Sequence, residues 1–421
     1  MPTDSLALGI DFGTSGARAA VIDLEQAVLT QVRCAYPSSD SLAESWRQTL
    51  FTLLDQIPVN LREQIGAIAV DGTSSSVLLC DSVGEPITSP LLYNDDQGKA
   101  ILGQLTQLAP TGHTVCSATS SLAKLLWWQE TLPPAVWTTA RYFMHQADWL
   151  GFLLHGQPGV SDYHNALKLG YDVGQLRYPD WLTGLNIRGL LPVVKEPGDA
   201  IAPLQPTITR RFHFPPSCVV CAGTTDSIAA FLASGANHPG DAVTSLGSTL
   251  VLKLLSQTRI DNSLYGIYSH RLGDLWLVGG ASNTGGAVLR HFFSEVQLAD
   301  LSSQIDLNQT SSLDYYPLLK PGERFPLNDP DLPPRLTPRP ENPVNFLYGL
   351  LDGIACIEQK GYALLETLGS TPLRQVYTAG GGAQNHVWTT IRQRRLNCPL
   401  VPALHAEAAV GAAKLTLNQL K

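Results

Sequence analysis

The first residues suited to chemistry are Asp11-Phe-Gly-Thr-Ser-Gly-Ala-Arg18, a glycine-rich turn between two strand-like segments. Glycine lacks a Cβ atom, so the backbone amides of such a turn can approach a phosphate group closely. Thr14 and Ser15 can donate hydroxyl hydrogen bonds to phosphate oxygens, and Asp11 can hold Mg²⁺ directly or through water. The spacing is not that of a P-loop. The alternative is a hairpin turn that binds nothing.

Three further polar turns follow along the chain. Gly223-Thr-Thr-Asp226 precedes a predicted helix, where the alternative role for Asp226 is that of a helix cap. Gly247-Ser-Thr249 is a second turn rich in amides and hydroxyls. Gly380-Gly-Gly-Ala-Gln-Asn385 suits close approach of a flat or anionic ligand, and its alternative is a purely conformational left-handed turn. Each of these turns is weak evidence when it is taken alone.

An α/β arrangement of strands and helices is predicted to position the turns. Period-2 and apolar patterns predict strands at 6–10, 17–24, 65–70, 219–222, 241–246, 250–255 and 375–379. Helical periodicity predicts helices at 41–54, 121–130, 144–155 and 345–368, and from about residue 227. The strand, polar turn, strand pattern of the N-terminus recurs near 241–255, which is a weak repeat of architecture.

Composition limits the class of protein. The 421 residues include 28 Lys and Arg against 36 Asp and Glu, a net charge of −8, which argues against a nucleic-acid binder. No apolar run is long enough for a membrane span, and no secretory signal is visible. Seven cysteines do not form a disulfide framework, so a reduced, cytoplasmic location is expected. Cys218 and Cys221 lie in an apolar segment, where a redox or metal role is disfavoured.

The order of the four turns resembles that of the FGGY carbohydrate kinases. The family's first phosphate motif is matched by Asp11, Gly13, Thr14 and Arg18, and its turn with the catalytic aspartate by Ala222, Gly223 and Asp226. The second phosphate motif is matched by Gly240 with Gly247–Thr249, and the adenosine motif by 380–385 followed by 407–413. Two smaller segments also resemble the family: 322–326 with 329–330 its Gly-Glu-Arg-x-Pro loop, and 282–286 its Gly-Gly segment. The resemblance covers nearly the whole chain.

The resemblance implies an α/β fold of two ribonuclease-H-like, actin/hexokinase-type domains with an interdomain cleft. The N-terminal domain, residues 1–222, is expected to bind sugar, and the C-terminal domain, residues 223–421, to bind ATP. It further implies that Asp226 is the general base, that Asp11 contacts sugar, and that both aspartates hold Mg²⁺. The implied ATP-binding residues are Gly13, Thr14, Ser15, Arg18, Gly247, Ser248, Thr249, Gly285, Gly381, Gly382 and Asn385.

The sugar is suggested by the loop after the third strand. Xylulose kinases tend to carry Met-His-Gly there, whereas Asp71-Gly-Thr-Ser-Ser75 is more similar to ribulose kinases. Ser74 and Ser75 are the expected partners of sugar hydroxyls, and the alternative is a loop in which Asp71 and Thr73 cap their own backbone. The family's Trp-Asn-Asp-x-Arg stretch is Tyr93-Asn-Asp-Asp-Gln97, which retains Asp95 but replaces the arginine by Gln97.

These features favour an ATP- and Mg²⁺-dependent kinase that converts D-ribulose to D-ribulose 5-phosphate. The alternatives are a D-xylulose or polyol kinase, or an actin-like ATP-binding protein or ATPase without sugar kinase activity. The expected partners are a sugar and ATP, with neither nucleic acid nor membrane, and the oligomeric state stays open. Lys124 matches a family lysine, although a solvated position is its alternative, and Arg392, Arg394 and Arg395 are expected to form a solvated basic helix face.

Overall fold

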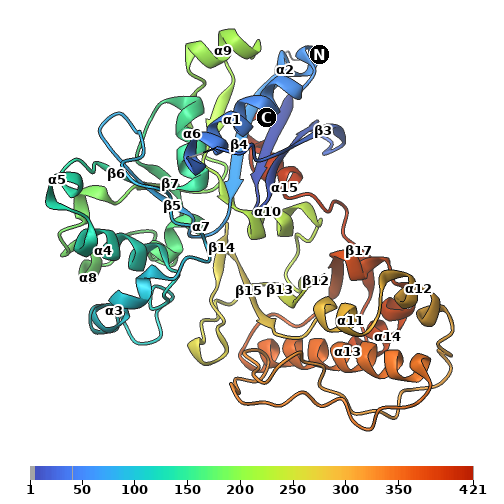
Figure 1. The fold of residues 1–421 in the computed structure, drawn as a ribbon. Coiled ribbons are helices and arrows are strands. Elements are labelled where there is room, and N and C mark those ends of the chain that lie inside the picture. The colour runs from blue at the N-terminus through green and yellow to red at the C-terminus, as the bar shows by residue number, and fades with distance from the viewer. Residues whose placement is uncertain (1–4, 40, 421) are drawn as a thin grey trace. The chain divides into compact units, whose positions relative to one another are not determined.

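A computed structural model describes residues 5–39 and 41–420 (Figure 1). The chain divides into two compact units, one ending at Ala233 but rejoined by the residues from Glu407 onward, the other formed by Ser234–Ala406. Sequence analysis instead expects domains 1–222 and 223–421. The observed division places Asp226 and the C-terminal helix in the first unit.

The first unit is built on a mixed sheet with the strand order β3-β2-β1-β4-β10-β9. These strands are β1 (Leu6–Phe12), β2 (Gly16–Ile22), β3 (Val28–Ala35), β4 (Ile65–Gly72), β9 (Ala200–Pro203) and β10 (Val219–Cys221). β4 runs parallel to both β1 and β10, whereas the outer pairs are antiparallel. The two-residue β11 (Thr224–Thr225) continues beside β4 in the same direction. The carboxyl ends of β1, β4 and β11 therefore reach one edge of the sheet.

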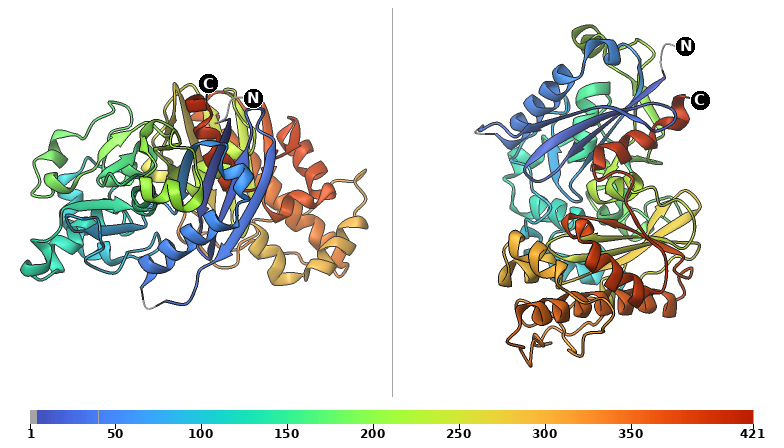
Figure 2. Two further views of the ribbon diagram at one scale, coloured as in Figure 1. Left: turned by 90° about the horizontal axis from the view of Figure 1, so that it is seen from above. Right: turned by 90° about the vertical axis from the view of Figure 1, so that its right-hand side faces the viewer.

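Alternating residues of β1 explain how helices cover this sheet. Leu8 and Ile10 pack into a core with α1 (Leu42–Gln56) and α6 (Gln146–His155). Ala7 faces the opposite side, in a core shared with α15 (Ala408–Leu415), the red helix beside the blue strands in Figure 2. Since successive strand residues point to opposite faces, one alternating apolar strand supports both layers.

Glycines bring the C-terminal helix into the first unit. A Cβ atom on Gly9 would lie 1.9 Å from the Ala409 carbonyl oxygen. A Cβ on Gly411 would lie 1.8 Å from the carbonyl oxygen of Ala229 in α10 (Asp226–Ala233). Only glycine permits such backbone approach. These contacts explain why the last helix belongs with β1 rather than with the preceding 170 or so residues.

A second core in the first unit lies beneath the loops expected to face the sugar. It joins the antiparallel pair β5 (Val77–Cys80) and β6 (Tyr142–His145) to α4 (Ser121–Thr131) and η1 (Gln97–Ile101). Trp128 of α4 is buried there against Phe143, as expected of a core tryptophan.

The second unit has its own six-stranded sheet, ordered β14-β15-β13-β12-β16-β17. Its strands are β12 (Asp241–Leu246), β13 (Leu250–Ser256), β14 (His270–Leu272), β15 (Leu275–Ser282), β16 (Gln375–Ala379) and β17 (Leu400–Pro402). The long helix α13 (Pro343–Thr367), orange in Figure 1, runs beside α14 (His386–Leu396). Helices α11 (Gly286–Phe292) and α12 (Glu295–Ser303) complete this unit.

The remaining elements are short. They are α2 (Val59–Arg62), α3 (Leu102–Leu108), α5 (Pro134–Trp137), α7 (Tyr163–Ala166), α8 (Asp180–Thr183), α9 (Pro206–Phe212), β7 (Val160–Asp162), β8 (Val193–Lys195), η2 (Leu167–Leu169), η3 (Arg188–Leu190), η4 (Ser263–Tyr265), η5 (Gly381–Gln384) and η6 (Leu417–Leu420). Across the described residues, no helix combines the length and apolar character that crossing a bilayer requires.

The prediction that Arg392 lies on a solvated face of α14 is wrong. This side chain is fully buried, and its Nε and Nη2 atoms each lie 2.7 Å from a carboxylate oxygen of Glu358. Its Nη1 atom donates to Thr378 Oγ1 at 2.9 Å. Arg395 is 39% exposed and pairs with Asp352. Helical periodicity places Arg392 toward α13, so the positive charge is buried with its partner.

Removing the buried arginine is expected to destabilise the second unit. Arg392→Met leaves the Glu358 carboxylate buried without its cation, so the free energy of unfolding should fall by about 3–5 kcal/mol. Arg395→Met, the matched control, should lower it by at most about 1 kcal/mol because that pair is partly solvated. Chemical denaturation measures both. Equal losses would contradict the assigned difference in burial.

Candidate active site

Three aspartates come together at the strand ends of the first unit. Asp11 in β1 is paired in register with Asp71 in β4. Asp71 is also in register with Thr224 of β11, and Asp226 begins α10 directly after that strand. Adjacent parallel strands therefore bring together the two carboxylates that sequence analysis assigned to chemistry and a third, Asp71.

Burial dominates the electrostatics of this cluster. Burial raises the pKa of Asp11, while a hydrogen bond with Asp71 and the charge of Arg18 oppose the rise. Burial, reinforced by the negative charge of Asp11, raises the pKa of the fully buried Asp71 well above its usual range. Among the described residues, no other donor lies within hydrogen-bond distance of the Asp71 side-chain oxygens. Two ionised carboxylates are both acceptors, so a hydrogen bond between Asp71 and Asp11 requires a proton on one of them. The idea that Asp71 caps its own loop is wrong.

The first phosphate-type turn leaves its hydroxyls open to a ligand. Thr14 and Ser15 are exposed, while the turn is closed by a 3.1 Å hydrogen bond from Gly13 N to Gly16 O. Tyr36 Oη donates to the Gly13 carbonyl oxygen at 2.6 Å and fixes the turn from outside. Arg18 lies 3.6 Å from Asp11 and 3.1 Å from Glu407. Its guanidinium therefore links the turn to the aspartate cluster and to the segment ahead of α15.

Asp226 is held at the end of a braced strand. Its Oδ1 atom accepts from Ser227 N at 2.6 Å, and the residue is partly exposed. Two residues earlier, the Thr224 hydroxyl lies 2.7 Å from His164 Nδ1 and its carbonyl accepts from Asn165 Nδ2 at 3.2 Å. A Cβ on Gly223 would lie 1.9 Å from the Val70 carbonyl oxygen, so this turn requires glycine. The carboxylate is thus presented by a rigid support.

The residues assigned to the sugar lie on two adjoining segments. Ser75 adopts a left-handed conformation, with φ of 67°, and its buried hydroxyl has no hydrogen-bond partner among the described atoms. Ser74 is partly exposed. Asp95 Oδ2 accepts from Leu92 N at 2.7 Å, so this carboxylate also shapes its own turn. Gln97 Oε1 is likewise buried without a partner within the described structure.

The second unit holds a cavity of about 650 Å³. Five assigned ATP residues line it: Gly247, Ser248, Gly381, Gly382 and Asn385. Thr249 and Gly285 are not in its lining. They support the turn instead, because a Cβ on Gly285 would lie 2.7 Å from the Thr249 backbone. The structure therefore brings together the second phosphate-type turn and the Gly-Gly-Gly turn.

Arg290 also lines this cavity, and sequence analysis missed it. Its Nη2 atom donates to Ser248 Oγ at 2.8 Å. Arg290 follows Gly286 by four residues on α11, and that spacing places both on one helix face. Applying this four-residue spacing to the Gly-Gly segment would have identified Arg290 as a cation beside the otherwise neutral phosphate-type turn.

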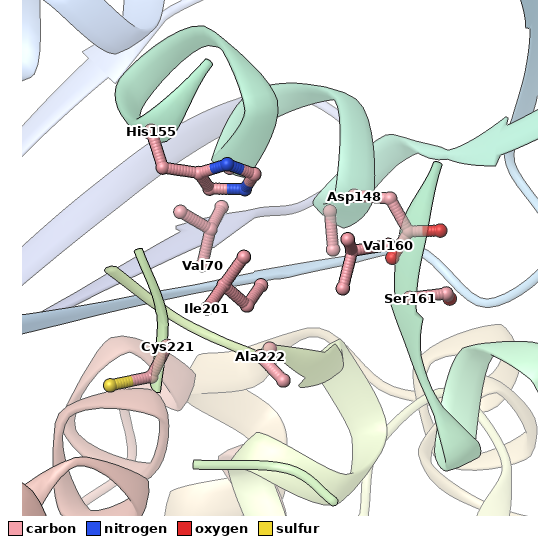
Figure 3. A pocket seen from close by; sticks show the side chains of 11 residues that line it. Val70, Asp148, His155, Val160, Ser161, Ile201, Cys221 and Ala222 are labelled. Carbon is pink, nitrogen blue, oxygen red and sulfur yellow. The ribbon is translucent and has the colours of Figure 1, made fainter. Parts of the chain in front are cut away.

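A second, enclosed cavity near the aspartate cluster is too small for a sugar. Figure 3 shows His155, Ile201 and Cys221 around it. Its volume is about 10 Å³, at the lower limit for one water molecule. Burial lowers the pKa of His155 to about 4 and raises that of Cys221 to about 12. A neutral imidazole and a protonated thiol give this cavity little reactivity, and the Cys221 thiol is unsuited to redox or metal chemistry.

Comparison with known proteins identifies the family. The N-terminal domain of the FGGY family of carbohydrate kinases matches residues 6–233, and its C-terminal domain matches residues 242–419. The chain belongs to the FGGY family of carbohydrate kinases. The sequence-based assignment to a sugar kinase is confirmed.

Similar proteins cover nearly all of this FGGY chain. A xylulose kinase of Lactococcus lactis is 23% identical over 410 residues, covering 90% of this chain and 80% of the relative. A gluconokinase of Bacillus licheniformis is 22% identical over 466 residues, covering 98% and 87%. A glycerol kinase structure from Plasmodium falciparum, with ADP, matches at a TM-score of 0.84 and 16% identity over 97% of this chain and 88% of that one. The expected pair of actin/hexokinase-type domains is confirmed.

Truncating Arg290 is expected to weaken nucleotide use by this FGGY kinase. A hydrogen bond to a charged group contributes about 1.5–3 kcal/mol, so Arg290→Ala should raise KM for ATP about ten- to hundredfold and leave KM for the sugar unchanged. Arg335→Ala is the control, because Arg335 pairs with Asp314 outside the cavity lining. Steady-state kinetics with each substrate varied in turn provides the measurement. A KM for ATP within twofold of the wild-type value would contradict this role.

Proposed function

We propose that the chain transfers the γ-phosphoryl group of ATP to the terminal hydroxyl of D-ribulose and releases D-ribulose 5-phosphate. The observation that carries the proposal is the convergence of Asp11, Asp71 and Asp226 at one sheet edge. A protein that only binds nucleotide has no need of a carboxylate set next to an open, hydroxyl-bearing turn. We place the reaction in the cytoplasm, with a sugar and ATP as partners.

Asp226 is assigned as the general base that accepts the proton of the attacking hydroxyl. An aspartate with an ordinary pKa near 4 is a weak base. That is sufficient because phosphoryl transfer passes through a loose transition state, where little charge develops on the nucleophile. Precise placement then contributes more than basicity, and the bracing of Thr224 by His164 and Asn165 supports such placement.

The two turns of exposed amides and hydroxyls are assigned to the triphosphate. The donors assigned on the first turn are Gly13, Thr14, Ser15 and Arg18. Those assigned on the second turn are Gly247 and Ser248, and Thr249 supports that turn. Gly285 supports the second turn, and the adenine end is assigned to Gly381, Gly382 and Asn385. The roughly 650 Å³ cavity suits a ligand the size of a nucleotide, since small-molecule sites usually span about 300–1,000 Å³.

Mg²⁺ is assigned to Asp11 and Asp226. Within the described part of the chain, no group of three or more His, Cys, Asp or Glu side chains could hold a metal ion. The two carboxylates of Asp11 and Asp226 fit Mg²⁺, which is usually held by one or two carboxylates together with water and substrate phosphates. When bound, the ion neutralises phosphate charge. Asp11 and Asp226 would hold it, while Arg18 balances the charge of Asp11.

The charge of the sugar site favours a neutral substrate. The assigned residues are Asp11, Ser74, Ser75, Asp95 and Asp226, and none of them is basic. A sugar acid would place its carboxylate beside this acidic set and be repelled. Gln97 in place of the family arginine removes a further cation. A neutral ketose is therefore preferred to an acid such as the gluconate that similar gluconokinases are named for.

D-Xylulose is the second candidate, because several similar proteins are named xylulose kinases. The loop favours D-ribulose. Where xylulose kinases tend to carry Met-His-Gly, this loop has Ser74 and Ser75, and the Ser75 hydroxyl has no hydrogen-bond partner among the described atoms. Hydroxyls both donate and accept, so this loop can satisfy a sugar hydroxyl of different orientation.

A substrate panel tests the proposal. ADP release is measured with D-ribulose, D-xylulose, glycerol, D-gluconate and no sugar, and kcat/KM should be highest for D-ribulose by at least about tenfold. That ratio corresponds to about 1.4 kcal/mol, roughly one well-placed hydrogen bond. Asp226→Ala is the matched variant, which should lose sugar-dependent release while binding an ATP analogue normally.

Two results would contradict it in different ways. A higher kcat/KM for D-xylulose would overturn the choice of sugar but keep the kinase assignment. ADP release that is equal with and without every sugar, or is unchanged in Asp226→Ala, would instead favour an actin-like ATPase.

A further inference from the structure

A buried lysine links the two segments assigned to the sugar. Lys124 lies in the first turn of α4 and is 0% exposed, so the solvated alternative is wrong. Its Nζ atom donates to the Ser75 carbonyl oxygen at 2.8 Å and also to the Leu92 carbonyl oxygen. A single ammonium group thus binds two loops through carbonyl groups that are 17 residues apart in the chain.

The two loops are held together by backbone pairing as well as by the Lys124 ammonium group. Val77 N donates to the Leu91 carbonyl oxygen at 2.8 Å, and Leu91 N donates to the Val77 carbonyl oxygen at 3.0 Å. Next to this backbone pair, Tyr93 N donates to Ser76 Oγ at 3.0 Å. Leu92 also donates through its amide to Asp95 Oδ2. Lys124 therefore binds the carbonyl group of Leu92, whose amide orients Asp95. It also binds the carbonyl group of Ser75, whose side chain is assigned to the sugar.

An ammonium group in this place is expensive to bury. Removing a cation from water costs several kcal/mol unless it is paired, so a buried lysine needs compensation. The charged groups that act on it are Asp95, which attracts it, and Lys168 of η2, which repels it. His145 of β6 lies 3.1 Å from Ser121 on the same helix turn. Burial lowers the pKa of Lys124 to about 8. An apolar residue would fill this space without that cost.

We propose that Lys124 is a positioning residue that locks the Ser74–Ser75 loop and the Leu92–Asp95 turn into one rigid sugar-binding surface. This inference rests on the proposed sugar site. Among the described residues, the Nζ atom of Lys124 donates to two backbone carbonyl oxygens and to no side chain, so its effect passes through Ser75 and Asp95. Because the lock depends on a charged donor, sugar binding should weaken as pH rises through about 8, where the ammonium loses its proton.

The test compares Lys124→Met with the wild-type chain and with Lys360→Met, a control on an exposed lysine of α13. Methionine is of similar length but donates no hydrogen bond. Lys124→Met should raise KM for D-ribulose at least tenfold and leave the dissociation constant of an ATP analogue within twofold. The wild-type decline in kcat/KM above pH 8 should be absent from this variant. Lys360→Met should behave as the wild type does.

Hydrogen exchange gives a readout that needs no turnover. The amides of Ser76, Tyr93 and Asp95 should exchange faster in Lys124→Met, while those of β1 and β4 keep their rates. Unchanged exchange at these three amides, an unchanged KM for D-ribulose, or persistence of the alkaline decline would each overturn the proposal. Faster exchange throughout the first unit would also overturn it, since Lys124 would then be a general stability residue. If the wild type shows no sugar-dependent turnover, the proposed function fails, and exchange alone decides whether Lys124 locks the loops.

Discussion

Asp11 and Asp71 are neighbouring carboxyl groups held in register on adjacent parallel strands, where little water reaches them. Burial penalises the charged form of both groups, so the pKa of Asp11 is raised and that of Asp71 is raised well above its usual range. By linkage, the pair contributes most stability at acidic pH and loses it as pH rises through the folded-state pKa values. The fold tolerates this cost because Arg18 supplies a partial counter-charge.

The rest of the first unit keeps that register. Gly9 lets α15 approach β1 so closely that a side chain would collide with it, and Gly223 does the same for the turn ahead of Asp226. A slip of one residue would turn every side chain of β1 to the opposite face. It would then separate Asp11 from Asp71 and turn Leu8 and Ile10 out of the core that they share with α1 and α6. Packing and chemistry are thus fixed by the same strand pairing.

The candidate nucleotide cavity of the second unit has few charged side chains in its lining. It is lined mainly by glycines, small polar residues and apolar side chains, with Arg290 beside the phosphate-type turn. Only 15% of the residues in the whole chain are charged, yet the second unit contains a fully buried ion pair between Arg392 and Glu358. A neutral turn can still bind phosphate, because backbone amides and hydroxyls are donors.

Local patterns predicted the elements well. The helices expected at 41–54 and 345–368 are observed as Leu42–Gln56 and Pro343–Thr367, and the strands 241–246 and 375–379 have the predicted bounds. Glycine-rich turns and the spacing of apolar residues are local signals, so a sequence records them directly. The order of these turns was also sufficient to indicate the FGGY family.

Features that depend on distant contacts were missed. Arg392 was expected in solvent, and a solvated position was the alternative for Lys124. Their partners lie 34 and 49 residues away, and no local pattern indicates such burial. Asp71 belongs to the site only through its pairing with Asp11, 60 positions earlier in β1. The return of α15 to the first unit rests on glycine contacts between segments at opposite ends of the chain.

The most direct test of the catalytic assignment is a crystal structure with D-ribulose and a non-hydrolysable ATP analogue. The account predicts the Asp226 carboxylate about 2.6–3.2 Å from the terminal hydroxyl of the sugar, the distance expected of a general base. It also predicts that this hydroxyl faces the γ-phosphate with Ser74, Ser75 and Asp95 around the sugar. A sugar bound away from Asp226, or with a different hydroxyl toward it, would contradict the central claim.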